Sequence, residues 1–147
     1  MNLRQLDKTD LIDVLAGWAK RLAVYLPSAG GVSRLERWDG TSALPERYRN
    51  TAVPLKELFL PPAETMFRFH KDRSGFGLEP ALPEAKASLV FGVRPCDARA
   101  LSLVDKLFRD SYEDVYYLSR RQTTLLAGLA CDKPYDSCFC TSLGLEP

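Results

Sequence analysis

Cysteine, histidine and long apolar runs are all scarce in this 147-residue sequence, which contains four cysteines and one histidine. Its 20 basic and 19 acidic residues are interspersed and leave a formal net charge of +1, so no broad charged surface is available for nucleic acid or an anionic membrane. No apolar run is long enough to span a bilayer, and the N-terminal segment meets charged residues before it could form a secretion signal. We therefore expect a cytoplasmic protein that binds neither nucleic acid nor membrane.

A glycine-rich nucleotide-binding turn is absent as well. The stretch GVRPCDAR (92–99) separates a predicted strand from a predicted helix, but it contains a single glycine. A backbone that approaches a pyrophosphate closely needs several glycines at such a turn. This absence disfavours a nucleotide-binding enzyme domain.

The length and ordinary hydrophobic content allow one buried core. We expect a single α/β domain over residues 1–147, with possible lobes at 1–70 and 85–147. Apolar residues recur at helical spacing from Leu11 to Leu22, which predicts an N-terminal helix. Strand-like segments at 23–26 and 32–38 then predict a hairpin. The helix and hairpin together form the predicted N-terminal lobe.

The middle of the chain, 41–83, is rich in proline, aromatic residues and charge, and no periodicity persists in it. We expect an extended segment anchored on the core by aromatic and other apolar side chains, namely Phe59, Met66, Phe67 and Phe69. Residues 71–84 contain glycines and prolines, and they predict a mobile loop or a boundary between lobes. His70, the single histidine, lies in a charged stretch and is expected to be exposed.

The last third predicts a strand over 88–93, an amphipathic helix over 98–108 and a second strand over 123–130. This order implies a right-handed crossover between parallel strands, and hence a small, partly parallel sheet. Cys96 follows the first strand and Cys131 follows the second, so both should lie at the carboxyl edge of the sheet, where open α/β folds place their sites.

All four cysteines, Cys96, Cys131, Cys138 and Cys140, therefore form a candidate metal site. A disulfide framework is disfavoured because Cys138 and Cys140 are too close in sequence for an easy mutual bridge. Four buried free thiols are a second alternative. Structural zinc suits four thiolates, although the spacing departs from paired C-x₂-C motifs, and an iron–sulfur cluster tolerates irregular spacing better. The spacing alone does not decide between zinc and a cluster.

Segments 90–101 (VFGVRPCDARAL), 114–121 (DVYYLSRR) and 125–144 (LLAGLACDKPYDSCFCTSLG) resemble the N-terminal region of a family of dicluster-ferredoxin-like electron-transfer subunits. This family contains the beta subunits of cytosolic sulfhydrogenases and the corresponding electron-transfer subunits of anaerobic sulfite reductases. Segment 51–69 resembles it too, so the resemblance covers about two thirds of the chain. Its R-P-C-D and C-F-C-T-S elements are the most specific.

The resemblance implies an iron–sulfur electron-transfer component of a cytosolic multi-subunit oxidoreductase, of hydrogenase or sulfite reductase type, with no catalytic residues of its own. The four cysteines would hold one [4Fe–4S] or [2Fe–2S] cluster. Positive charge at Arg94 and Lys133 would raise the reduction potential, and Asp97 would lower it. The alternative for these three residues is a solvated or salt-bridging side chain.

Family members continue past the C-F-C-T-S motif into two ferredoxin-type cysteine runs, and this sequence has no C-x₂-C-x₂-C run. We expect it to be an N-terminal fragment of a longer subunit or a short form that works with other subunits. The alternative function is a non-catalytic docking module with structural zinc or no metal, whose interface is segment 51–69. Tyr112, Tyr116 and Tyr117 are expected to pack a helix end and the adjoining loop; the alternative is that, with Arg120 and Arg121, they form a surface for a partner or a polyanionic cofactor.

Overall fold

The computed structural model describes residues 5–7, 9–28, 32–45, 48–84 and 86–145. Within them a mixed sheet has the strand order β2-β1-β5-β6, in which β1 pairs antiparallel with β2 and parallel with β5, and β5 pairs parallel with β6. The strands of this sheet are β1 (Ala23–Pro27), β2 (Leu35–Arg37), β5 (Ser88–Val93) and β6 (Thr124–Gly128). The predicted α/β class, hairpin and partly parallel sheet are confirmed.

The crossover from β5 to β6 contains two helices, α2 (Pro95–Leu107) and α3 (Val115–Gln122), where the sequence predicted one. Pro95 occupies the first helical position of α2, where its missing N–H is not needed. Asp114 caps α3 because its Oδ1 accepts a hydrogen bond from the backbone N–H of Tyr117 at 2.8 Å. Tyr116 and Tyr117 are buried, so they pack the helix against the core, whereas Tyr112 is exposed.

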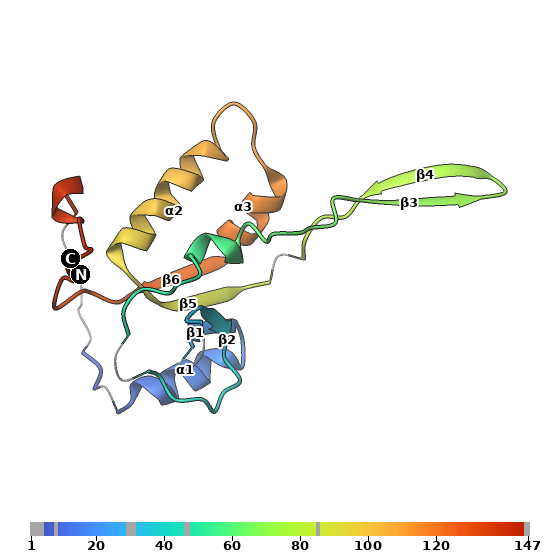
Figure 1. Ribbon diagram of the computed structural model, residues 1–147. Coiled ribbons are helices and arrows are strands. Elements are labelled where there is room, and N and C mark those ends of the chain that lie inside the picture. Colours follow the sequence, from blue (N-terminus) through green and yellow to red (C-terminus); the bar gives the residue numbers. More distant parts are fainter. Residues whose placement is uncertain (1–4, 8, 29–31, 46–47, 85, 146–147) are drawn as a thin grey trace.

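Helices lie on both sides of the sheet (Figure 1). On one side α1 (Leu11–Ala19) packs on a cluster formed by Leu15, Val24, Leu26, Trp38 and Leu89. On the other side α2, α3 and the short 3₁₀ helix η1 (Leu55–Leu58) enclose a second cluster, formed by Leu35, Leu55, Phe59, Val90, Val93, Leu101, Tyr117 and Leu118. These two cores fix the sheet whose carboxyl edge carries Cys96 and Cys131.

Tyr117 lies at the centre of the second core. Its ring stacks on Phe108 with centroids 4.7 Å apart and meets the edge of Phe59 at 6.1 Å. Its hydroxyl donates a 2.6 Å hydrogen bond to Oδ1 of Asp105, which also pairs with Nε of Arg121 at 3.1 Å. Burial, together with the bond to Asp105, raises the pKa of Tyr117. The buried hydroxyl is thus satisfied without exposing the core to water.

The buried Phe59 allows a direct test of this packing. Phe59→Ala should lower the free energy of unfolding by about 3–5 kcal/mol, because a side chain only 1% exposed is removed from the core. Phe69→Ala is the matched control, since that side chain is 75% exposed and its loss should change stability by about 0.5 kcal/mol or less. Urea denaturation measures both variants. Equal effects would contradict the packing described here.

The expectation of an aromatic segment anchored along its whole length is only partly right. Phe59 is buried, but Met66, Phe67 and Phe69 are exposed. The expected mobile loop is wrong for residues 71–80, because residues 67–80 form an antiparallel hairpin of β3 (Phe67–Asp72) and β4 (Gly75–Pro80) that projects from the rest of the chain (Figure 1). The alternative, a boundary between lobes within 71–84, stays a prediction. Alternating polar and apolar residues pair across a two-residue turn, which favours a hairpin even without a core beneath it.

Strands from both predicted lobes, 1–70 and 85–147, contribute to the same sheet. The division into lobes stays a prediction. The helices within the described ranges are too short or too polar to cross a membrane.

Candidate metal centre

The four cysteines share one neighbourhood beyond the carboxyl ends of β5 and β6. Cys96 is the second residue of α2, and Cys131 follows the end of β6 at Gly128. Partial burial raises the pKa of the Cys140 thiol, and the proximity of Cys96, Cys138 and Cys131 raises it further. All four thiols are free, with Cys138 exposed and the other three partly buried. The topology therefore brings Cys96 and Cys131 to one end of the sheet, and the loop that follows β6 brings Cys138 and Cys140 near them.

The present arrangement is looser than a closed ion site. Within the described residues, no three His, Cys, Asp or Glu side chains are grouped to hold a metal ion. The assignment of Cys96, Cys131, Cys138 and Cys140 as ligands to one metal centre stays a prediction.

The chemistry around the sulfurs fits an anionic, sulfur-ligated group. The backbone N–H of Tyr135 donates to Sγ of Cys138 at 3.3 Å, and Nδ2 of Asn50 donates to Sγ of Cys96 at 3.2 Å. Cys96 also lies in the first turn of α2, where the helix dipole and free N–H groups stabilise a thiolate. Hydrogen bonds to ligand sulfurs are one of the means by which proteins tune iron–sulfur centres.

Arg94 holds together the backbone segments that carry the cysteines. Its side chain is 7% exposed and donates through Nη1 to the carbonyls of Leu129 (3.2 Å) and Ala130 (2.7 Å), just before Cys131. It also donates through Nε to the carbonyl of Arg49 (3.4 Å) and through Nη2 to that of Tyr48. Arg94 is therefore buried rather than solvated, and it forms no salt bridge with any residue that the structure describes. The alternative for Arg94 is wrong to that extent. The guanidinium is a buried clamp on four carbonyls.

The other charged candidates differ in burial. Asp97 is partly buried, and burial raises the pKa of its carboxyl against an opposing effect of Arg94. Lys133 is exposed in the loop between Cys131 and Cys138. His70 lies on the projecting β3 strand and is exposed, as predicted.

Sequence reasoning missed the segment Tyr48–Asn50, which joins Arg94 to the cysteine loop. The guanidinium of Arg49 lies 3.7 Å from the centroid of the Tyr135 ring, and that of Arg94 lies 4.9 Å from the Tyr48 ring. Burial, followed by the Asp97 carboxylate, raises the pKa of Tyr48 to about 12. No local pattern points to these residues, because each acts on a partner far along the chain.

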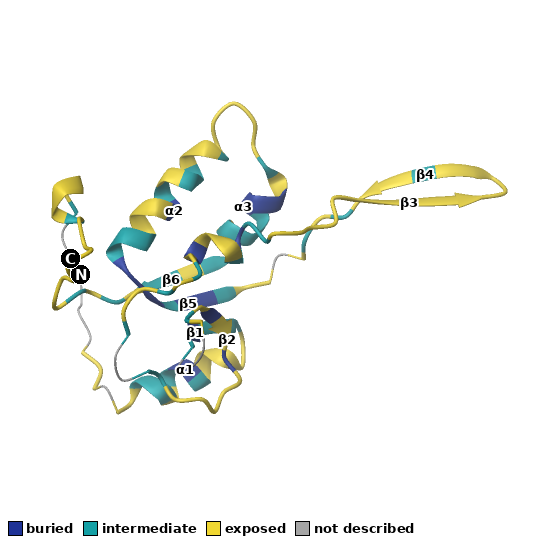
Figure 2. Cartoon of the chain, in the orientation of Figure 1, coloured by how far each residue is buried: buried dark blue, intermediate teal, exposed yellow. Residues whose placement is uncertain are grey.

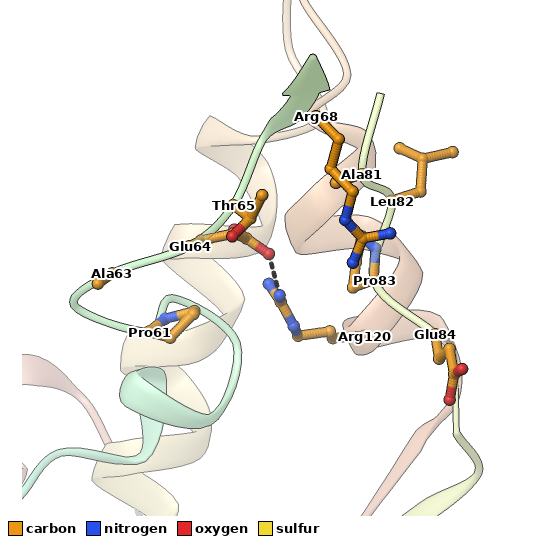
Figure 3. Close-up of a pocket in the computed structure, with 10 residues that line it drawn as sticks. All are labelled: Pro61, Ala63, Glu64, Thr65, Arg68, Ala81, Leu82, Pro83, Glu84 and Arg120. Atoms are coloured by element: carbon orange, nitrogen blue, oxygen red, sulfur yellow. Dashed lines mark hydrogen bonds and ion pairs between the residues drawn. The ribbon is translucent and has the colours of Figure 1, made fainter. Parts of the chain in front are cut away.

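A second feature, an open pocket of about 400 Å³, lies at the base of the β3–β4 hairpin (Figure 3). Its wall includes Glu64 and Arg120, which form an ion pair with each other, together with Arg68 and Glu84. Arg120 and Glu84 precede β6 and β5, so this pocket adjoins the amino ends of the strands. It contains no cysteine and lies apart from the candidate metal centre.

The chain is similar to Sulfhydrogenase 2 subunit beta of Pyrococcus furiosus, with 31% identity over 114 residues. The match covers 77% of this chain and 32% of that protein, so the chain spans about a third of the curated relative's length. No protein-family model matches the sequence. No solved structure matches it either.

Proposed function

From the relation of this chain to the sulfhydrogenase beta subunit family, we propose that it is an iron–sulfur electron-transfer part of a cytoplasmic, multi-subunit oxidoreductase. The curated relative is a hydrogenase subunit by name, which favours the hydrogenase type over the sulfite reductase type. The observation that carries the proposal is the gathering of Cys96, Cys131, Cys138 and Cys140 at one end of the sheet, with N–H donors already directed at two of their sulfurs. Reduced thiols of this kind persist in the cytoplasm.

The four thiolates would hold a [4Fe–4S] or [2Fe–2S] cluster, which supplies one-electron transfer when bound. The chain's own residues set the ligand positions and the local charge. Arg94 fixes the backbone before Cys131 and beside Cys96, and its buried positive charge favours an additional electron nearby. Asp97 opposes that effect, and the exposed Lys133 adds a weaker positive contribution. No residue of the chain needs to move a proton for this role, so we assign it no catalytic residue.

Metal and sulfide analysis tests the proposal. Protein purified without oxygen should be brown, absorb in the visible region and contain iron and acid-labile sulfide in similar amounts. A colourless protein with one zinc per chain would instead support the docking module with structural zinc, since four thiolates also suit tetrahedral Zn²⁺. Such a result would overturn the electron-transfer proposal.

Asn50 offers a finer test of the same site. Asn50→Ala should keep the cluster but lower its reduction potential by about 40 mV, which corresponds to one lost hydrogen bond of about 1 kcal/mol to the Cys96 sulfur. Redox titration followed by visible absorbance measures the shift. Thr51→Ala, at the neighbouring position, is the control and should leave the potential unchanged. A potential equal to that of the unaltered protein would show that Asn50 does not act on the centre.

A further inference from the structure

The β3–β4 hairpin has one apolar and one polar face. Directly paired residues of an antiparallel hairpin lie on the same face, and successive residues alternate between faces. The pairs Phe67–Pro80, Phe69–Leu78 and Lys71–Phe76 therefore share one face, the hairpin's apolar face. Arg68–Glu79, His70–Gly77 and Asp72–Gly75 form the opposite, polar face.

The apolar face is uncovered. Phe67, Phe69, Phe76 and Leu78 are each more than half exposed, and the hairpin extends away from the body of the protein (Figure 2). Phe69 and Phe76 stack on each other with centroids 6.3 Å apart, and the two strands chiefly contact one another. An exposed apolar surface of this kind, bordered by polar residues, marks a binding surface or else an aggregation hazard.

The turn at the tip is built to hold this shape. Oδ1 of Asp72 accepts hydrogen bonds from the backbone N–H groups of Ser74 (2.8 Å) and Gly75 (3.1 Å), and Gly75 has φ of 145°, which favours glycine. A two-stranded hairpin on its own is only marginally stable in water, so this one gains stability when its apolar face is covered.

The charge on the apolar face indicates what covers it. Lys71 lies among Phe69, Phe76 and Leu78, and this face contains no carboxylate. Arg73 adds a second cation at the turn, and neither residue forms an ion pair within the described part of the chain. A second copy would bring another Lys71 and no acid into the contact, and burying unpaired charges is costly. A partner with an acidic residue beside an apolar groove would satisfy Lys71.

We infer that the hairpin's apolar face docks into an apolar groove, bordered by Asp or Glu side chains, on a different protein chain. A membrane is the less suitable surface, because polybasic lipid-binding segments carry about four to eight clustered cations. The hairpin has Arg68, Lys71 and Arg73 against Asp72 and Glu79. The inference deepens the proposed function, on which it rests for the existence of partner subunits.

Site-specific crosslinking identifies the partner chain and the face used. The photoreactive residue p-benzoylphenylalanine replaces Phe76 in one full-length variant and His70, on the polar face, in a second. In cells that naturally produce the protein, position 76 should crosslink to one different chain, at an apolar segment with Asp or Glu, and position 70 should not. A crosslink to a second copy, to lipid or to nothing would overturn the inference.

Binding constants measured between hairpin variants and that partner chain provide a second test. Phe69→Ser/Leu78→Ser should weaken binding at least about tenfold, as loss of a central apolar contact does, and Lys71→Glu should also weaken it. The matched controls on the polar face, Arg68→Ser/Glu79→Ser and His70→Glu, should change affinity less than about twofold. Equal effects on both faces would overturn the inference.

Two further assays test the other possible occupants of the hairpin's apolar face, and a third measurement separates this inference from the proposed function. Light scattering tests whether the protein dimerises through Phe69, and flotation tests binding to vesicles of phosphatidylcholine and phosphatidylglycerol; a positive result in either overturns the inference. Iron content is measured in every variant. Hairpin-dependent binding by an iron-free protein would refute the electron-transfer proposal alone, whereas a normal cluster with unchanged binding would refute the docking inference alone.

Discussion

Cys138→Ser is expected to lose its iron and sulfide and to bleach the visible absorption of the protein. Removing one of the four proposed thiolate ligands should weaken cluster binding at least roughly a hundredfold, beyond the ~10–100-fold loss that follows when only a hydrogen-bonding partner of a ligand is removed. The effect should be local, because Cys138 is exposed and contributes nothing to either hydrophobic core. Iron and sulfide analysis after anaerobic purification measures the loss.

Ser137→Ala is the matched control, since it alters an exposed neighbour in the same loop and removes no sulfur. That variant should retain the iron of the unaltered protein. A Cys138→Ser protein that also retained all its iron would show that Cys138 is not a ligand.

Arg94→Met is expected to lower the free energy of unfolding by about 3–5 kcal/mol. The substitution keeps much of the side-chain volume, but it leaves the carbonyls of Tyr48, Arg49, Leu129 and Ala130 without their buried donor. For a domain whose total stability is of order 5–15 kcal/mol, this is a large fraction. Urea denaturation of the metal-free, reduced protein measures this change in the free energy of unfolding without any contribution from cluster binding.

Arg94→Lys distinguishes clamping from charge. Lysine keeps the positive charge but lacks the planar fork that reaches several carbonyls at once, so this variant should also be destabilised, though less than Arg94→Met. Arg99→Met, on an exposed position of α2, controls for the loss of an arginine and should change stability by about 0.5 kcal/mol or less. Equal stability of Arg94→Met and Arg99→Met would contradict the clamp.

The parallel part of the fold was accessible from local sequence patterns. Residues 88–93 form a continuous apolar strand, and the helical periodicity after it leads to a second apolar strand, so the crossover and its carboxyl edge followed. Cys96 and Cys131 could be placed at that edge for the same reason. Helix α3 was harder to predict because it is short and depends on the Asp114 cap and on burial of Tyr116 and Tyr117.

Other features depend on contacts that no local pattern encodes. The four carbonyls that Arg94 binds belong to two segments distant from it in sequence, and Asn50 reaches Cys96 from the proline-rich middle of the chain. The β3–β4 hairpin was missed for a different reason. Its aromatic residues lie in a proline-rich stretch that predicts core anchors, whereas the register places Phe67 and Phe69 on an exposed face. Hydrophobic residues identify a surface that needs covering, but they do not say whether the same chain covers it.

X-ray absorption at the iron and zinc edges of anaerobically purified protein tests the central claim most directly. The account predicts iron surrounded by sulfur, with a second iron nearby, and loss of that signal in Cys138→Ser. Zinc bound by sulfur with no neighbouring metal, or iron without sulfur ligands, would contradict an iron–sulfur centre held by Cys96, Cys131, Cys138 and Cys140.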